Sequence, residues 1–121
     1  MSSLSLVYLD TEVALGQIGD VDTMNGMLVM LEESLARDIP LITLSFQSGN
    51  VAAANRLLHG IKGFVPIFCR DDFCARVVEV EAMSKDSKSL TASDAYNELR
   101  PDLEQLLADV SEYLNVSGGA G

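Results

Sequence analysis

Apolar residues recur at intervals of three or four along most of the chain, which is the pattern of amphipathic helices. The longest runs are Met27, Met30, Leu31, Leu35, Ile39, Ile42 and Phe46, and then Tyr96, Leu99, Leu103, Leu106, Leu107, Val110, Tyr113 and Leu114. Two shorter runs lie between them: Ala54, Leu57, Ile61, Phe64, Val65 and Phe68, followed by Phe73, Val77, Val80 and Met83. No segment alternates as a strand would, so the pattern predicts an all-α fold.

The polar residues between these runs predict where the helices begin and end. A short helix starts after Asp10 and ends in the glycine-containing region 16–19, and either Asp20 or Asp22 caps the long helix that follows. In the pair Gly49-Asn50, the glycine suits a left-handed helix end and the asparagine suits the cap of the next helix. Four main helices with short connections predict an antiparallel four-helix bundle with a short extra N-terminal helix.

The chain has 121 residues, the size of one domain. We therefore expect a single domain over residues 1–121, with the bundle at about 20–115 and a flexible tail at 116–121. Pro66 lies inside its helical run and should bend the end of that helix, because it cannot donate a backbone hydrogen bond.

Composition restricts the partners and the location. The formal net charge of −10 repels the phosphates of nucleic acids and anionic lipids, so we expect neither as a ligand. No apolar stretch reaches the roughly 20 residues that span a bilayer, and the N-terminus lacks the basic start of a signal peptide. Cys69 and Cys74 fit no common metal or redox spacing, which favours small buried side chains and no metal site. We expect a cytoplasmic protein.

His59 is the only histidine, and it lies in Leu57-Leu58-His59-Gly60-Ile61-Lys62-Gly63. Its position on a helical wheel is opposite the apolar run, which predicts an exposed side chain. A lone helical histidine is most often structural. However, Gly60 and Gly63 each cost a helix about 1 kcal/mol, so their presence indicates a need for clearance beside His59. Lys62 and Gly63 follow at the offsets that share its face.

These residue types suit a phosphoryl group carried on an imidazole. A neutral imidazole nitrogen can attack phosphorus, and the cation of Lys62 can stabilise the charge that is transferred. The chain contains no glycine-rich nucleotide-binding loop. The phosphoryl group should therefore come from another protein and pass to another protein, without autonomous ATP-dependent kinase activity.

The segment His59-Gly60-Ile61-Lys62-Gly63 resembles the H-x-x-K-G signature of histidine-containing phosphotransfer domains. The long preceding helix, the Gly49-Asn50 turn and Glu81 in the next helix are similar to that family as well, over about residues 10–115. The resemblance implies a monomeric phosphorelay intermediate in which His59 accepts a phosphoryl group at Nε2. The donor would be a receiver-domain aspartate of a hybrid sensor kinase and the acceptor a response regulator, with Mg²⁺ held by the receiver.

The implied receiver docking surface contains Asn55, Arg56, Gly60, Gly63 and Pro66. The chain departs from the family after Gly63, where Phe64-Val65-Pro66-Ile67-Phe68 replaces the usual small residues; this affects docking geometry more than phosphorylation. Two alternatives stay open. One is a helical adaptor that binds a receiver or a kinase without being phosphorylated. The other is a catalytic domain, although the sequence offers no second nucleophile, base or metal cluster near His59.

Overall fold

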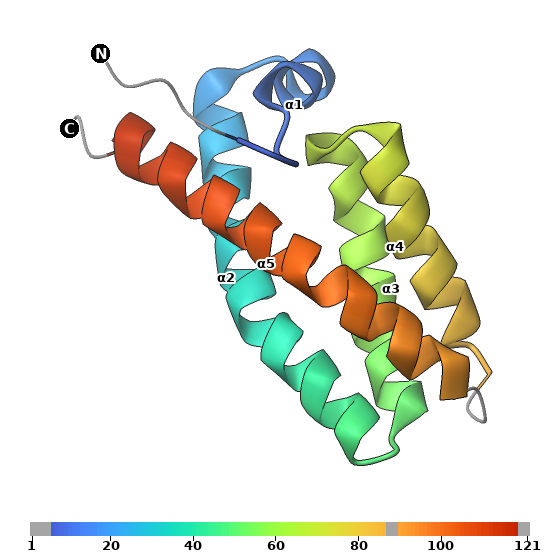
Figure 1. Ribbon diagram of the computed structural model, residues 1–121. Helices are drawn as coiled ribbons and strands as arrows, with labels where there is room; N and C mark the ends of the chain where they lie inside the picture. Colours follow the sequence, from blue (N-terminus) through green and yellow to red (C-terminus); the bar gives the residue numbers. More distant parts are fainter. Residues whose placement is uncertain (1–5, 87–89, 119–121) are drawn as a thin grey trace.

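The computed structural model describes residues 6–86 and 90–118. It is all-α, as the pattern predicted (Figure 1). The helices are α1 (Thr11–Ile18), α2 (Val21–Gln47), α3 (Val51–Phe68), α4 (Asp71–Met83) and α5 (Leu90–Gly118). Within the described residues the only β pairing is an isolated bridge between Leu9 and Cys69. None of the helices described has both the length and the apolar character needed to cross a bilayer.

The predicted helix boundaries are mostly confirmed, because they depend on local chemistry. The Asp20 side chain accepts from Thr23 N–H and caps α2, which resolves the choice between Asp20 and Asp22. Gly49 has a positive φ of 78°, and the Asn50 side chain accepts from Ala53 N–H at the start of α3. The predicted tail position is wrong in part, since α5 continues to Gly118. Residues 119–121 lie outside those described.

The helices surround one apolar core, and two details of its composition differ from the prediction. Met30 is 66% exposed, whereas Met24 and Leu28 occupy the core side of α2. In α3, Leu58 is fully buried and Leu57 is only half-buried. The apolar spacing allowed both Leu57 and Leu58 in α3, which are adjacent, and both Leu28 and Met30 in α2, which are two residues apart. Packing against the other helices selects one of them, because a helix turned by one residue presents a face about 100° away.

Helix α3 lies between two neighbours, and this arrangement decides what surrounds its outer face. It packs against α2 on one side and α4 on the other, and α5 packs against both α2 and α4. Helices α2 and α4 are not direct neighbours in the described chain. Pro40, Pro66 and Pro101 are all inside helices that continue past them.

A buried carboxylate fastens the segment that precedes α1. Asp109 in α5 is fully buried, and its Oδ2 accepts from the backbone N–H groups of Val7, Tyr8 and Leu9. The Tyr8 ring stacks on Phe73 with ring centres 4.6 Å apart. The sequence pattern of residues 4–18 was weak because these contacts are polar and long-range. The result is a strap that joins α5 to the junction of α3 and α4.

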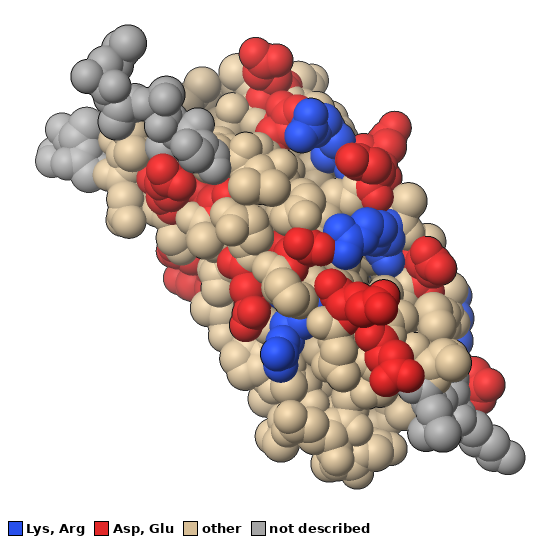
Figure 2. All heavy atoms as spheres, viewed as in Figure 1, with Lys and Arg blue, Asp and Glu red and all other residues tan. Residues whose placement is uncertain are grey.

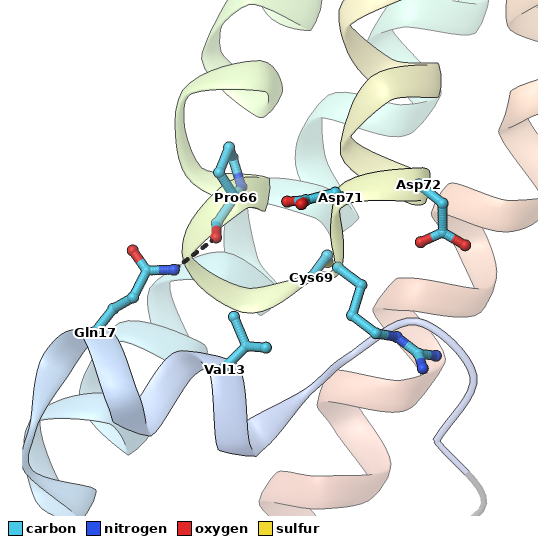
Figure 3. Close-up of a pocket in the computed structure, with 7 residues that line it drawn as sticks. Val13, Gln17, Pro66, Cys69, Asp71 and Asp72 are labelled. Atoms are coloured by element: carbon cyan, nitrogen blue, oxygen red, sulfur yellow. Dashed lines mark hydrogen bonds between the residues drawn. The ribbon is translucent and has the colours of Figure 1, made fainter.

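Helix α1 packs against α2 and α3, and it lies beside the end of α3, near the start of α4 (Figure 3). Gln17 Nε2 donates to the backbone oxygen of Pro66 at 2.9 Å. Both residues line an open pocket together with Val13, Cys69, Arg70, Asp71 and Asp72. Cys69 and Cys74 are free and buried, as predicted, and burial raises the pKa of both thiols. Pro66 therefore serves the contact between α3 and α1.

Candidate functional site

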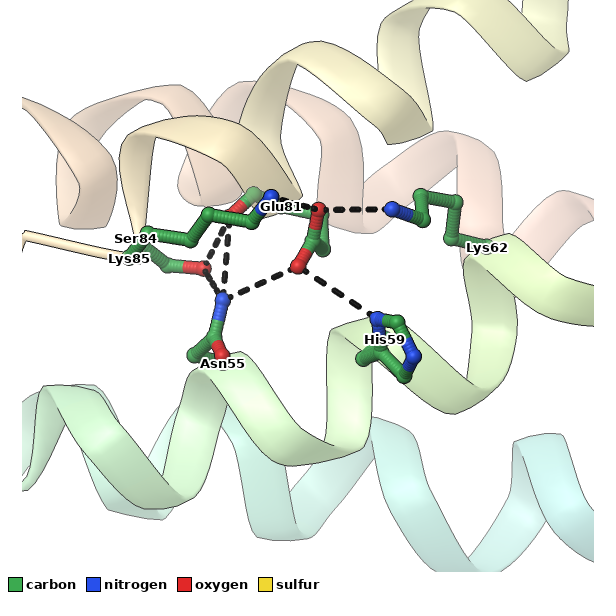
Figure 4. Close-up of polar contacts among 6 residues, drawn as sticks. All are labelled: Asn55, His59, Lys62, Glu81, Ser84 and Lys85. Carbon is green, nitrogen blue, oxygen red and sulfur yellow. Dashed lines mark hydrogen bonds and ion pairs between the residues drawn. The ribbon is translucent and has the colours of Figure 1, made fainter.

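His59 projects from the outer face of α3, where the helical wheel placed it. Its side chain is 69% exposed, and Nδ1 lies 3.6 Å from Oε2 of Glu81 in α4 (Figure 4). This separation is longer than a hydrogen bond but close enough for electrostatic attraction. The other ring nitrogen, Nε2, points away from Glu81. One nitrogen of the imidazole thus faces a carboxylate while the other faces outward.

Glu81 is the centre of a polar cluster on the α3–α4 interface, although its side chain is only 2% exposed. Its Oε1 accepts from Lys62 Nζ at 3.1 Å, and Lys85 Nζ lies 3.9 Å from the same oxygen. Its Oε2 accepts from Asn55 Nδ2 at 3.1 Å. A buried carboxylate with this many donors is fixed in position, because leaving it unpaired costs several kcal/mol.

The end of α4 is held to α3 by the same cluster. Asn55 Nδ2 also lies within hydrogen-bond distance of the Glu81 carbonyl and of Ser84 Oγ, at 3.1 and 3.0 Å. The Ser84 hydroxyl, which is buried, donates to the Glu81 carbonyl at 2.7 Å. Asn55 thus fixes the helix that carries Glu81, rather than standing free on the outer surface.

Two opposing effects act on the pKa of Glu81. Burial raises it, whereas the hydrogen bonds from Lys62 and Asn55 and the positive charges of Lys62 and Lys85 lower it. The net pKa shift is downward from the ordinary value of 4.5. Glu81 is therefore ionised at neutral pH, and a negative charge faces Nδ1 of His59.

The lowered pKa of Glu81 predicts how folding stability depends on pH. Stability from the ionised carboxylate is fully present above the unfolded value of 4.5 and is lost as the pH falls through the lower folded pKa. Glu81→Gln should reduce the free energy of unfolding by about 1–3 kcal/mol at pH 7, because Lys62 loses its charged partner. Urea titrations from pH 7 downward should show the gap between wild type and variant closing as the pH falls below the unfolded value of 4.5. A gap that stays constant into acid would contradict this assignment.

The carboxylate has a chemical consequence for His59. A carboxylate facing Nδ1 favours the tautomer that carries its proton on Nδ1, because that N–H is attracted to Oε2. The lone pair is then on Nε2, which faces outward. If Nε2 forms a bond to an electrophile, the positive charge that develops on the ring is stabilised by Glu81. The arrangement can therefore act as a nucleophile toward a group brought from outside.

The two glycines beside His59 are not required by packing within the chain. Both are exposed, and a Cβ added at Gly60 or Gly63 would meet no atom within 4 Å. Neither has the positive φ that other residues avoid. Arg56 is also exposed, and no ion pair joins its guanidinium to another described residue. The surface of α3 beside His59 is therefore unobstructed, because the two glycines have no side chains.

The structure brings together only some of the residues that the sequence singled out. Asn55, His59 and Lys62 meet at Glu81, whereas Arg56, Gly60 and Gly63 line the exposed side of α3. The central position of Glu81 was missed as a site feature, as were Ser84 and Lys85. The i,i+4 spacing of Glu81 and Lys85 was the available signal. Among the described residues, no three His, Cys, Asp or Glu side chains are grouped to hold a metal ion.

Comparison of the chain with family models, with curated proteins and with solved structures finds no match.

Proposed function

We propose that this protein is a histidine phosphotransfer intermediate of a two-component phosphorelay. In this role His59 accepts a phosphoryl group from the aspartate of a receiver domain, such as that of a hybrid kinase, and passes it to a response regulator. The protein would act in the cytoplasm as a monomer. The proposal includes the finer fold assignment, an antiparallel four-helix bundle made by α2, α3, α4 and α5.

A single observation carries this proposal: an exposed imidazole has Nδ1 held toward a buried carboxylate and Nε2 directed outward. A histidine that only filled space or capped a helix would not need one ring nitrogen toward a carboxylate and the other directed outward. A hydrolytic role would need a substrate pocket at the imidazole, whereas His59 stands on a convex helix face with open glycines beside it. A macromolecular donor that presents its reactive group at a surface fits this shape.

The transfer step can be written on these residues. The Nε2 lone pair of His59 attacks phosphorus, the bond between phosphorus and the aspartyl oxygen breaks, and the aspartate leaves as a carboxylate with that electron pair. The phosphorylated ring holds its proton on Nδ1, and its positive charge is stabilised by Glu81. Transfer to a second receiver reverses the step, with a new aspartate oxygen attacking phosphorus and Nε2 leaving.

Lys62 has two tasks in this mechanism. One N–H of its ammonium donates to Glu81 at 3.1 Å, and the side chain is 28% exposed. An ammonium has three donors, so the remaining ones can reach an oxygen of a phosphoryl group on His59. Because the transition state of phosphoryl transfer is loose, such charge stabilisation does most of the catalysis. A Mg²⁺ ion, expected on the receiver, would supply the remaining positive charge for the transferred phosphoryl group.

The direct test is to supply the phosphoryl group from a receiver. Isolated receiver domains, phosphorylated beforehand with a small radiolabelled acyl phosphate, are mixed with the purified protein, and label is mapped by peptide analysis. We expect one label on His59 that is lost in acid and stable in base, as a phosphoramidate is. Protein mixed with labelled ATP and Mg²⁺ alone should gain none.

Three outcomes would contradict the proposal. Acid-stable label would indicate an ester on a hydroxyl side chain. Label from ATP alone would reveal a nucleotide site. If every receiver domain tested binds the protein tightly but leaves His59 unlabelled, the adaptor alternative is favoured.

A further inference from the structure

Most carboxylates of this acidic chain are at least partly exposed, whereas Glu81 is buried. Figure 2 shows Asp and Glu side chains spread over the face that α5 crosses. The Glu81 side chain, by contrast, is only 2% exposed. Bulk water therefore cannot replace a missing hydrogen bond to Glu81, and the orientation of its carboxylate depends on donors from the protein.

The two oxygens of this carboxylate have different partners (Figure 4). Both nearby lysines lie at Oε1: Lys62 Nζ donates to it at 3.1 Å, and Lys85 Nζ is 3.9 Å away. Oε2 lies 3.6 Å from Nδ1 of His59 and accepts from Asn55 Nδ2 at 3.1 Å. In the described part of the chain, Asn55 is the one residue that donates a hydrogen bond to Oε2. The two ammonium charges attract both oxygens, and the Asn55 amide opposes a rotation of the carboxylate toward them.

Asn55 can hold Oε2 because its own amide is fixed. It lies four residues before His59 in α3, so the two side chains project from the same face of the helix. Its Nδ2 also lies 3.1 Å from the carbonyl oxygen of Glu81 and 3.0 Å from Oγ of Ser84. Oε2 and this carbonyl can only accept hydrogen bonds, so the amide must present its NH₂ group, and not its oxygen, to α4.

We infer that Asn55 is a positioning residue for His59: its amide holds Oε2 of Glu81 toward Nδ1 and so keeps the lone pair on Nε2. The partner of one ring nitrogen decides where a neutral imidazole carries its proton, and Oε2 is that partner only while it faces the ring. With the carboxylate turned toward the lysines, the proton can occupy Nε2, which then has no lone pair to attack phosphorus. The inference rests on the proposed function for its effect on transfer, whereas its effect on the ring can be measured without any partner.

The tautomer of His59 can be measured without ambiguity, because this is the only histidine in the chain. In protein with ¹⁵N-labelled histidine, at about pH 9 and thus above the usual titration range of histidine, the ¹⁵N chemical shifts report which ring nitrogen carries the proton. We expect mainly the Nδ1–H form in the wild type and mainly the Nε2–H form in Asn55→Ala. Transfer from a phosphorylated receiver should be about tenfold slower in Asn55→Ala, a typical loss when a residue that orients a reacting group is removed.

Three further variants separate positioning from packing. Asn55→Asp keeps the shape of the side chain but replaces the donor with a carboxylate that repels Oε2, so it should lose at least as much transfer as Asn55→Ala. Ser84→Ala loosens the end of α4 but keeps the bond from Asn55 to Oε2, so its loss should be smaller. Circular dichroism and melting curves confirm that each variant folds.

Gln17→Ala is the matched control. The Gln17 amide also joins another helix to α3, by donating to the backbone oxygen of Pro66 at 2.9 Å, but it has no contact with Glu81. In this variant the tautomer of His59 should be unchanged, and the rate of transfer should stay within about twofold of the wild type.

Several outcomes would overturn the inference. These are a wild type mainly in the Nε2–H form, an Asn55→Ala variant with the wild-type tautomer at any rate of transfer, and an Asn55→Asp variant as active as the wild type. A Ser84→Ala variant as slow as Asn55→Ala would also overturn it, because Asn55 would then act by holding the end of α4. If no receiver labels the wild type but the tautomer changes in Asn55→Ala, the proposed function fails and the control of the ring by Asn55 stands.

Discussion

Replacing His59 by Gln should abolish acceptance of the phosphoryl group while the protein stays folded. The glutamine amide has no nucleophilic nitrogen, so the receiver would keep its label and none above background would appear on the variant. Because the imidazole is 69% exposed, its loss should change the free energy of unfolding by only about 0.5 kcal/mol. Label transfer from a phosphorylated receiver and a urea titration measure the two effects on the same sample.

The comparison also tests the surface position of His59. Residual label in His59→Gln would place the acceptor on another side chain. A large loss of stability would mean that the contact with Glu81 has a mainly structural role. Because binding and transfer are separable, the variant should still bind the receiver, and calorimetry with the unphosphorylated domain would show it.

Gly63→Leu should lower transfer about a hundredfold or more while making the protein more stable. Leucine is a better helix former than glycine by about 0.5–1 kcal/mol, and the chain leaves open space where its side chain would begin. Function should nevertheless fall, because Gly63 shares the face of His59 and a leucine there would hold a partner away from Nε2. A displacement of about 1 Å at a reacting centre can cost about a hundredfold in rate.

Two further substitutions make the Gly63 prediction specific. Gly26 is another exposed glycine inside a helix with no atom within 4 Å of an added Cβ, and it lies far along α2 from His59. Gly26→Leu should stabilise the protein by a similar amount and leave transfer unchanged. Gly63→Ala, which adds only one carbon, should fall between wild type and Gly63→Leu. Full activity in Gly63→Leu would show that no partner approaches closely at this position.

The N-terminal segment and the core show where sequence reasoning was insufficient. Asp109 binds three consecutive backbone N–H groups from about a hundred residues away, and no local pattern announces such a contact. The choice of Leu28 over Met30 for the core of α2, and of Leu58 over Leu57 for that of α3, follows from the orientation of each helix in the assembly. The spacing of apolar residues restricts the rotation of each helix about its axis to a range. Packing of the side chains then selects one rotation within that range.

What the sequence determined by itself is local. The caps at Asp20 and Asn50 and the left-handed turn at Gly49 follow from short-range hydrogen bonds and backbone freedom, and the wheel placed His59 on the outer face because helical geometry is fixed. Only the tertiary structure brought Glu81 of α4 beside His59 and drew Lys62 and Asn55 onto its carboxylate. Such contacts between helices depend on how α3 and α4 pack. The register of α3 against α4 is set by the packing of the whole core.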